Sequence, residues 1–229
     1  MAQNSTRKAL VVGATGLIGG LLLRQLLEDR TWAQVITMGR RGPGVENSKL
    51  QALTVDFDEL GEKPEMAAHF PVDDVFCCLG TTIKKAGSKE AFRKVDHDYV
   101  LATARAGLAA GATRMVVISS VGASAKAMSF YLRVKGELEA SLEGLGYPAL
   151  HLFQPSVLLG DREESRPFEA VGIAAARRGN FLLGGALAKY KGVEAVDVAS
   201  AMIAAAKRGG DGVHRHRYED IMALLGREV

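Results

Sequence analysis

The sequence predicts a doubly wound α/β fold, in which helices cover both faces of a parallel sheet. Two observations support this prediction. Short apolar runs alternate with longer segments of helical periodicity, as expected of strands that are buried on both faces. A glycine-rich turn also joins the first apolar run to the first helical segment.

Each predicted element follows from its own residues. In chain order, the predicted strands are residues 9–12, 35–38, 53–55, 75–79, 115–118 and 150–153. Apolar residues recur at helical spacing between them, and the helices that this spacing predicts are 17–27, 90–110 and 130–145. Gly146 and Pro148 end the last of these helices, because glycine favours helix ends and proline cannot continue a helix.

The pattern changes after Pro155, and polar, charged and glycine-rich stretches follow from Gly160 onward. The helices expected in this part are 167–178, 197–207 and 218–225. No repeat, low-complexity tract or linker divides the chain, so we expect a single domain over residues 1–229. Residues 160–192 and 209–229 are expected to form a small substrate lobe beside the carboxyl ends of the strands.

The composition is that of an ordinary folded protein. Apolar residues make up 48% of the 229 residues and charged residues 24%, and 29 basic residues against 26 acidic ones give a net charge of +3. These values argue against disorder, a collagen-like repeat and a nucleic-acid partner recognised by charge alone.

The cysteines, histidines and apolar stretches bear on location and metal binding. Cys77 and Cys78 are adjacent, too close for an ordinary disulfide, so we interpret them as reduced, buried thiols. The polar amino terminus does not resemble a signal peptide, and no apolar stretch approaches the roughly 20 residues that span a bilayer. We therefore expect a cytoplasmic protein without a membrane partner. His214 and His216 lack a third ligand in the sequence, and we interpret them as part of a polar surface strand rather than a metal site.

The turn after the first predicted strand has the spacing G-x-x-G-x-x-G, which is typical of a dinucleotide-binding Rossmann loop. Gly13 permits the tight turn, Gly16 lets the backbone approach a pyrophosphate, and Gly19 allows the helix to pack closely on the strand. The first turn of the helix presents free N–H groups to the phosphates. The cofactor-binding residues expected here are Gly13, Thr15, Gly16, Leu17, Ile18 and Gly19.

The end of the second predicted strand indicates which dinucleotide is bound. An acidic residue there would bind the ribose 2′-hydroxyl of NAD, but the sequence has Arg40 and Arg41 and no carboxylate. A guanidinium can instead hold a 2′-phosphate with two hydrogen bonds, so we predict NADP as the cofactor, with Arg40 the stronger candidate. The alternative is that both arginines are solvated surface charges.

Three further turns, each directly after a predicted strand, are expected to contact the same cofactor. Their residues are Asp56 and Phe57 after the third strand, Leu79, Gly80, Thr81 and Thr82 after the fourth, and Pro155, Ser156 and Val157 after the sixth. The first turn would lie at the adenine, although Asp56 equally suits a helix N-cap. The last turn would lie at the nicotinamide, or would only reverse the chain.

A serine, a tyrosine and a lysine form the expected catalytic site. Ser120 follows the fifth strand, with Ser119 as the alternative, and Tyr131 and Lys135 share one face of the next helix because they are four residues apart. Reduction of a carbonyl by hydride needs a proton for the developing alkoxide. Tyr131 would donate this proton, Lys135 would stabilise the phenolate and bind the nicotinamide ribose, and Ser120 would polarise the carbonyl.

Several longer segments carry a family resemblance. They are Cys-Cys-Leu-Gly-Thr-Thr at 77–82, Lys-Ala-Gly-Ser at 85–88, Val-Asp-His-Asp-Tyr-Val at 95–100, Ser-Ser-Val-Gly-Ala at 119–123, and residues 131–137 and 160–167. They resemble the short-chain dehydrogenase/reductase superfamily in its atypical or extended branch, and more closely the Tat-interacting-protein-like NAD(P)-binding oxidoreductases. The resemblance implies an NADP-binding Rossmann domain with Ser120, Tyr131 and Lys135 as its site. Where such proteins usually carry Arg-Pro after the sixth strand, this sequence has Gln154 and Pro155.

We expect an NADPH-dependent reductase of a small, apolar carbonyl compound. The apolar side chains expected to line the substrate site, unless they belong to the core, are Met128, Phe130, Phe168, Phe181 and Leu183. The alternative is a regulatory or redox-sensing protein that binds NADP(H) with little turnover, because the resembling family includes members discussed as regulators that bind partner proteins. The intact serine, tyrosine and lysine favour the enzyme, since a pure sensor has no need of an acid beside the hydride.

Overall fold

The structure is a computed structural model and describes residues 7–159 and 190–227. Seven parallel strands form its main sheet, in the spatial order β3-β2-β1-β4-β5-β6-β9. The strands are β1 Arg7–Val12, β2 Trp32–Gly39, β3 Leu50–Thr54, β4 Asp74–Cys77, β5 Arg114–Ile118, β6 Ala149–Phe153 and β9 Gly212–His216. This arrangement confirms the predicted doubly wound α/β fold, and the strand order reverses between β1 and β4.

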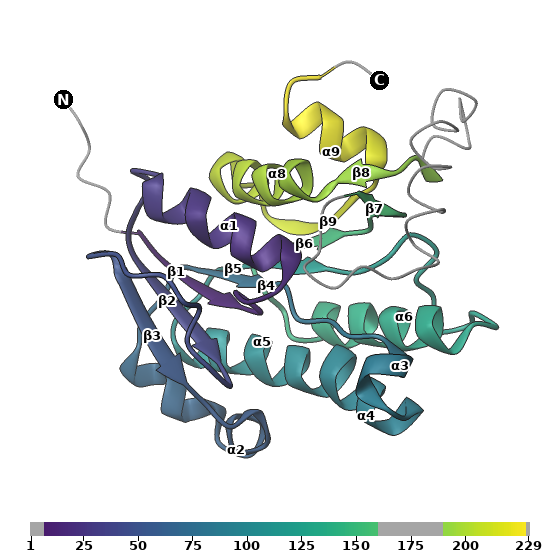
Figure 1. Cartoon of the computed structure of the whole chain (residues 1–229), viewed down its shortest axis with the longest axis horizontal. Helices are drawn as coiled ribbons and strands as arrows, with labels where there is room; N and C mark the ends of the chain where they lie inside the picture. The colour runs from purple at the N-terminus through teal and green to yellow at the C-terminus, as the bar shows by residue number, and fades with distance from the viewer. Residues whose placement is uncertain (1–6, 160–189, 228–229) are drawn as a thin grey trace.

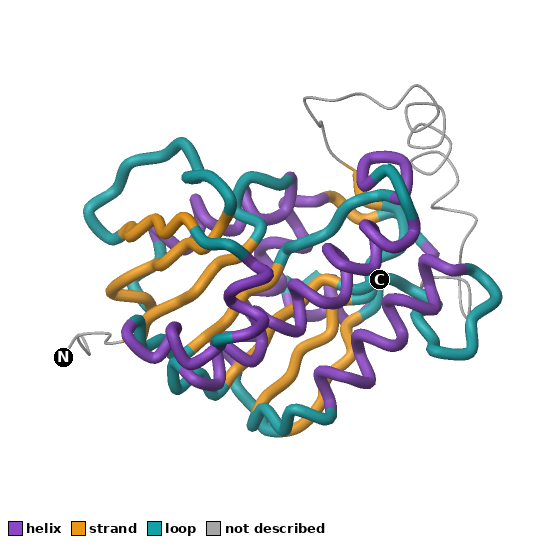
Figure 2. Tube along the Cα trace, turned by 90° about the horizontal axis from the view of Figure 1, so that it is seen from below, coloured by secondary structure: helices purple, strands orange, loops and turns teal. Residues whose placement is uncertain are grey.

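Helices cover both faces of this sheet (Figure 1). On one face lie α1 Leu17–Glu28 and α8 Ala195–Arg208, with α9 Tyr218–Leu224 beside α8. On the other face lie α5 Tyr99–Ala109 and α6 Phe130–Glu143. Seen from below, the strands run side by side among the helices (Figure 2).

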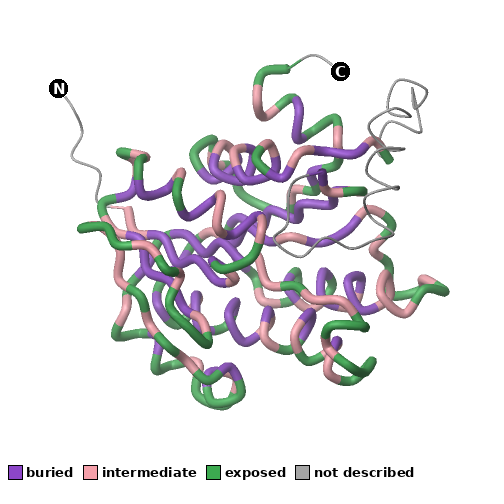
Figure 3. Tube along the Cα trace, in the orientation of Figure 1, coloured by how far each residue is buried: buried purple, intermediate pink, exposed green. Residues whose placement is uncertain are grey.

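Side chains alternate between the two faces of each strand and build two apolar clusters. In β1, Ala9 and Val11 belong to the cluster under α1 and α8, whereas Leu10 and Val12 belong to the cluster under α5. Buried residues therefore run continuously along the central strands and the inner sides of the helices (Figure 3). Because the central strands are buried on both faces, they appear in the sequence as unbroken apolar runs.

The expected helix at 90–110 is three consecutive elements rather than one. They are α4 Lys89–Arg93, the five-residue π-helical turn η2 Lys94–Asp98, and α5. A π turn adds residues to one turn of the helix, so the side chains on either side of it face different directions. Both Asp96 and His97, polar residues in this turn, are buried.

Several short elements were not expected from the sequence. They are α2 Phe57–Glu62, the 3-10 helix η1 Pro64–His69, α3 Ile83–Ala86, and the strands β7 Leu158–Leu159 and β8 Val193–Glu194, which form a separate two-stranded sheet. Each has six residues or fewer, too few for a hydrophobic period to stand out in the sequence.

The carboxyl-terminal part joins the main sheet. Strand β9 pairs with β6 in parallel, and α9 packs on α8. Residues 160–189 lie outside the described residues, together with the expected helix at 167–178 and the expected site residues Phe168, Phe181 and Leu183. The substrate lobe therefore stays a prediction. None of the helices that the structure describes is long and apolar enough to cross a membrane.

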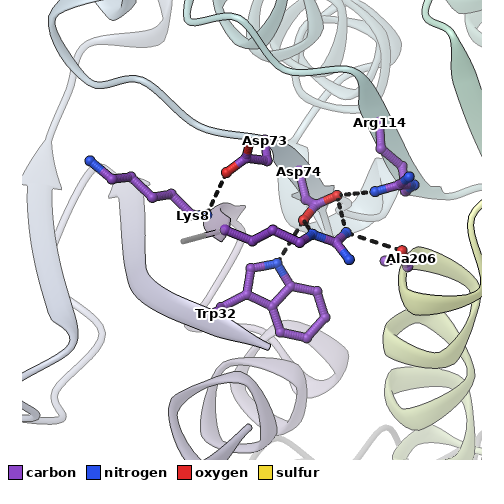
Figure 4. A network of polar contacts seen from close by, with 7 residues as sticks. Lys8, Trp32, Asp73, Asp74, Arg114 and Ala206 are labelled. Carbon is purple, nitrogen blue, oxygen red and sulfur yellow. Dashed lines mark hydrogen bonds and ion pairs between the residues drawn. The ribbon is translucent and has the colours of Figure 1, made fainter. Parts of the chain in front are cut away.

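One buried carboxylate connects the amino-terminal ends of four strands (Figure 4). Asp74, at the start of β4, accepts hydrogen bonds from Trp32 Nε1 at 2.6 Å, Arg114 Nη1 at 2.6 Å, and Arg7 Nε and Nη2 at 2.9 and 2.6 Å. Arg7 also donates to the carbonyl of Ala206 near the end of α8, at 3.0 Å. Such a set of donors offsets the cost of burying a charge, so these contacts hold β1, β2, β4, β5 and α8 together at the edge opposite the glycine loop.

Three histidines stack between β6 and β9. The rings of His151 and His216 lie 5.3 Å apart with Nδ1 to Nε2 at 3.0 Å, and the His214 ring lies 4.9 Å from that of His151. Burial, together with the other histidines, lowers the pKa of His151 to about 3, and burial above all lowers the pKa of His216 to about 4. Both are therefore neutral in the folded protein near neutral pH. Within residues 7–159 and 190–227, no three His, Cys, Asp or Glu side chains are placed to hold a metal ion.

We predict that acid destabilises the protein through these histidines. Their folded pKa values lie below the ordinary value of 6.5, so the unfolded state binds more protons and stability falls as the pH drops from about 6.5 towards 4. Each histidine contributes at most about 1.4 kcal/mol per pH unit. Urea unfolding across this range should show a shallower pH slope for His151→Phe than for the wild type. The exposed control His69→Gln should keep the wild-type slope, and a His151→Phe slope equal to the wild type would contradict the assignment.

Candidate active site

The loop after β1 has no room for side chains at two of its glycines. Gly13 has a φ of +85°, and a Cβ there would lie 2.6 Å from the carbonyl carbon and oxygen of Cys78. A Cβ on Gly19 would lie 2.1 Å from the carbonyl oxygen of Gly13. Glycine at both positions therefore lets α1 and the end of β4 approach the loop, as the sequence predicts.

The same loop offers unused donors to an anion. Helix α1 begins at Leu17 with Gly16 as its N-cap, and no side chain caps it. Thr15 and Gly16 are exposed, whereas Ile18 is buried in the core. Free N–H groups and the positive end of the helix dipole fit a pyrophosphate at this place.

Two arginines lie exposed at the end of β2. Gly39 ends the strand, and the side chains of Arg40 and Arg41 make no hydrogen bond or ion pair with any residue that the structure describes. Both residues are therefore exposed at the end of the strand that pairs with β1, and a contact with a 2′-phosphate requires such accessible guanidinium groups.

The turn after β3 has a structural role in the described contacts. Asp56 Oδ1 accepts a hydrogen bond from Asp58 N at 2.8 Å and caps α2, which was one of its two predicted roles. Phe57 is buried, and its ring stacks on Tyr99 with the centroids 5.1 Å apart. The Phe57 side chain thus belongs to the core, which leaves only its backbone for a ligand.

The turn after β4 is bonded to the π-helical turn. Gly80 is exposed, Thr82 caps α3, and Thr81 N donates to Asp96 Oδ2 at 2.7 Å. Leu79 contacts the apolar cluster under α5, and its backbone lies next to Gly13. This predicted cofactor turn and the glycine loop therefore lie side by side at the carboxyl edge of the sheet.

Lys135 forms a buried ion pair that the sequence did not predict. Its Nζ lies 2.8 Å from Asp96 Oδ1, and the two side chains are only 3% and 1% exposed. Burial disfavours the ammonium, but the Asp96 carboxylate and the Tyr131 phenol outweigh this effect and raise the pKa of Lys135. Lys135 therefore stays charged at neutral pH. The sequence signals for Asp96 were an acidic residue inside the expected helix at 90–110 and its place in the Val-Asp-His-Asp-Tyr-Val segment that carries the family resemblance.

Tyr131 lies one helical turn before Lys135 on α6. Its half-buried ring packs against Phe92 with the centroids 5.7 Å apart. In the described part of the chain, no group forms a hydrogen bond with the Tyr131 hydroxyl. The phenol is thus held by its ring while its O–H stays available to a ligand.

The two serines after β5 differ in what they contact. The Ser119 hydroxyl donates a hydrogen bond to Glu139 on α6. The Ser120 hydroxyl makes only a 3.4 Å contact with the carbonyl of Val121. Of the two, Ser120 therefore has the hydroxyl that is available to a substrate.

A close contact holds the loop after Ser120 against α6. A Cβ on Gly136 would lie 2.1 Å from the carbonyl carbon of Ser124, and Ser124 N donates to the carbonyl of Leu132 at 3.1 Å. Sequence reasoning missed Gly136, although a glycine inside a helical pattern often marks such an approach. The contact brings the serine loop against the helical turns that carry Tyr131 and Lys135.

The turn after β6 is bonded to the segment before β8. The Ser156 hydroxyl donates to the carbonyl of Lys191 at 2.5 Å, Pro155 is buried, and Val157 is 43% exposed. The hydroxyl of Ser156 thus stabilises the chain reversal after β6, which was one of the two predicted roles of this residue. Of the expected substrate-lining residues, Met128 is fully exposed, and Phe130 packs on Phe92 with the centroids 6.0 Å apart.

Comparison with known proteins places the chain in a family. Residues 13–146 match the family model described as NAD(P)H-binding. The protein HTATIP2 of Rattus norvegicus is 40% identical over 167 residues, which cover 71% of this chain and 67% of the rat protein. The fmp52 protein of Emericella nidulans is 38% identical over 165 residues, covering 70% and 71% of the two chains.

Solved structures with low sequence identity share the fold. The Bordetella bronchiseptica enzyme WbmH in complex with NAD+ has a TM-score of 0.68 and 16% identity, covering 93% of this chain and 75% of that one. A short chain dehydrogenase from Burkholderia cenocepacia in complex with NADP has a TM-score of 0.64 and 16% identity, covering 98% and 93%.

The relatives also correct the expected location. The FMP52 proteins of Emericella nidulans, Scheffersomyces stipitis, Meyerozyma guilliermondii and Lodderomyces elongisporus are all named mitochondrial. These names contradict the cytoplasmic location expected from the sequence and point to a mitochondrial one. The family model spans more than half of the chain, and the chain therefore belongs to the NAD(P)H-binding family, as a Tat-interacting-protein-like member related to HTATIP2 and FMP52.

Proposed function

We propose that the protein is an NADPH-dependent oxidoreductase that reduces a small, apolar carbonyl compound. The observation that carries this proposal is the buried Lys135–Asp96 pair, which fixes a charged lysine one helical turn from Tyr131, whose hydroxyl forms no hydrogen bond with a described residue. A general acid for carbonyl reduction needs such a cation nearby, because the cation stabilises the phenolate left after proton transfer.

Residues at the carboxyl edge of the sheet would hold the cofactor. The glycine loop from Gly13 to Gly19 would bind the pyrophosphate, and Arg40 would bind the 2′-phosphate. Arg40 follows β2, so the adenosine half would lie over β2 and β3, and the nicotinamide half would lie over β5 and β6. When bound, NADPH supplies the hydride for the reduction.

The chain's own residues would supply the proton and stabilise the oxyanion. Tyr131 would donate its phenolic proton to the carbonyl oxygen as negative charge develops there. The Lys135 ammonium would stabilise the resulting phenolate, and the Ser120 hydroxyl would donate a hydrogen bond to the same oxygen. In the reverse direction, the phenolate of Tyr131 would accept the proton from an alcohol.

Replacing Tyr131 by Phe tests the proposed acid. The variant should lower kcat by at least about 100-fold, because general acid catalysis contributes factors of 10²–10⁴. Its Kd for NADPH should stay within about threefold of the wild type, since only the acid is removed. Loss of NADPH absorbance with a panel of apolar carbonyls, including phenanthrenequinone and benzaldehyde, measures turnover.

A matched control and the rival function complete this test. Tyr218→Phe, the same change on α9, should leave kcat within about twofold of the wild type. Turnover that survives in Tyr131→Phe would refute the role of the phenol. A wild-type protein that binds NADPH and reduces no member of the panel would favour a sensor of NADP(H) over a reductase.

Replacing Arg40 by Ala tests the preference for NADPH. A charge-assisted, two-pronged contact is worth about 1.5–3 kcal/mol, so Kd for NADPH should rise at least about tenfold. Kd for NADH, which lacks the phosphate, should stay within about twofold. Fluorescence titration measures both constants, and Arg41→Ala serves as the neighbouring control with a smaller effect. Equal losses for the two dinucleotides in Arg40→Ala would refute the phosphate contact.

A further inference from the structure

We propose that Glu139 is a positioning residue of this site. It holds the ends of β5 and β6 in place against the face of α6 that carries Tyr131 and Lys135. The inference rests on the proposed function, because it concerns how Ser120 and the nicotinamide end of the site are placed. No described contact suggests that Glu139 itself touches a ligand.

Glu139 lies on the same face of α6 as the two residues of the proposed acid. Tyr131, Lys135 and Glu139 follow one another at intervals of four residues, so all three side chains project along one stripe of the helix. Glu139 is 5% exposed. A buried carboxylate at this position requires hydrogen-bond donors from the elements packed against it.

Two donors, one after each of two neighbouring strands, meet this carboxylate. The Ser119 hydroxyl donates to Oε1, and Gln154 Nε2 lies 3.0 Å from both Oε1 and Oε2. Among the residues that the structure describes, the nearest cation is Arg215, whose Nε lies 3.9 Å from Oε2 and whose guanidinium also pairs with Glu143. Hydrogen bonds from the strand ends, rather than a close ion pair, therefore hold Glu139.

These bonds fix the residues that follow each donor. Ser120 follows Ser119, and Pro155 follows Gln154. The two turns are also bonded to each other, since Val121 N donates to the carbonyl of Pro155 at 3.0 Å. One carboxylate on α6 thus sets where the Ser120 hydroxyl and the turn after β6 lie relative to Tyr131.

The side-chain amide of Gln154 can donate to this carboxylate in only one of its two orientations. Its Oε1 accepts a hydrogen bond from Arg217 Nε at 3.1 Å, so its amide N–H groups face Glu139. Because Gln154 Nε2 lies 3.0 Å from both oxygens of Glu139, an amide at position 139 would place its N–H groups against those of Gln154 in either orientation. The network therefore requires an acceptor-only group at 139, which a carboxylate supplies and an amide of the same size does not.

The test compares Glu139→Gln with Glu143→Gln, the same substitution one turn later at an exposed position of α6. In Glu139→Gln, kcat for phenanthrenequinone should fall at least about tenfold, because small misplacements of reacting groups cost this much or more. Kd for NADPH should rise at least about fivefold, while Kd for 2′,5′-ADP, which lacks the nicotinamide half, should stay within about twofold. Glu143→Gln should leave all three values at the wild-type level.

A swap of the two groups provides the rescue. In the double variant Glu139→Gln/Gln154→Glu, the amide at 139 accepts from Ser119 and donates to the carboxylate at 154, which accepts from Arg217. All the hydrogen bonds of the network are restored, so kcat and Kd for NADPH should return to within about threefold of the wild type.

Other outcomes overturn the proposal. Glu139→Gln values equal to those of Glu143→Gln, or a parallel loss of affinity for NADPH and 2′,5′-ADP with a lowered Tm, would show that Glu139 has no positioning role or only a structural one. If the wild type binds NADPH but shows no turnover, the proposed reductase activity is refuted. The Kd values of Glu139→Gln for NADPH and for 2′,5′-ADP then decide whether Glu139 positions the site. A wild type that does not bind NADPH refutes both.

Discussion

The buried ion pair between Lys135 and Asp96 is the interaction on which the geometry of the site depends. It connects α6, the π-helical turn and, through Thr81 N, the turn after β4. Breaking a buried pair by removing one partner costs about 3–5 kcal/mol, because the remaining charge has no compensation. The lysine side chain is therefore fixed at the edge of the sheet where the glycine loop lies. Buried, charged groups with shifted pKa values cluster at functional positions of proteins.

The polar groups at the two ends of the sheet differ in how far their hydrogen bonds are already formed within the protein. At the amino-terminal ends of the strands, the Asp74 carboxylate already accepts hydrogen bonds from Arg7, Trp32 and Arg114. At the carboxyl-terminal ends, the Tyr131 hydroxyl forms no hydrogen bond with a described residue, the Ser120 hydroxyl makes only the 3.4 Å contact with the carbonyl of Val121, and no side chain of the described residues caps the first turn of α1. This difference follows from the topology, because a parallel sheet places its ligand crevice beyond the carboxyl ends of its strands.

The sequence predicted well what depends on local patterns. The apolar strands, the glycine loop and the four-residue spacing from Tyr131 to Lys135 are each determined by neighbouring residues. Among the described residues, the predicted strands and most of the predicted helices are present with boundaries shifted by a few residues, whereas the helix expected at 90–110 is interrupted by the π-helical turn. The residues that sequence reasoning missed, Asp96, Gly136 and Glu139, act through partners 12 to 39 positions away in the chain. Their signals were a polar residue or a glycine at a position where an apolar helix face was expected, and only the tertiary packing identifies the partner. Phe57 shows the converse case, because its place after a strand suggested a ligand contact whereas its ring packs in the core.

A crystal structure of the complex with NADPH tests the central claim most directly. The claim is that the dinucleotide lies across the edge of the sheet with its nicotinamide end at the lysine fixed by Asp96. We expect density for the pyrophosphate at the amino terminus of α1, for the 2′-phosphate at Arg40, and for the nicotinamide ribose within hydrogen-bond distance of Lys135 Nζ. A complex in which the nicotinamide lies away from Lys135 and Tyr131, or in which the phosphates avoid the glycine loop, would contradict it.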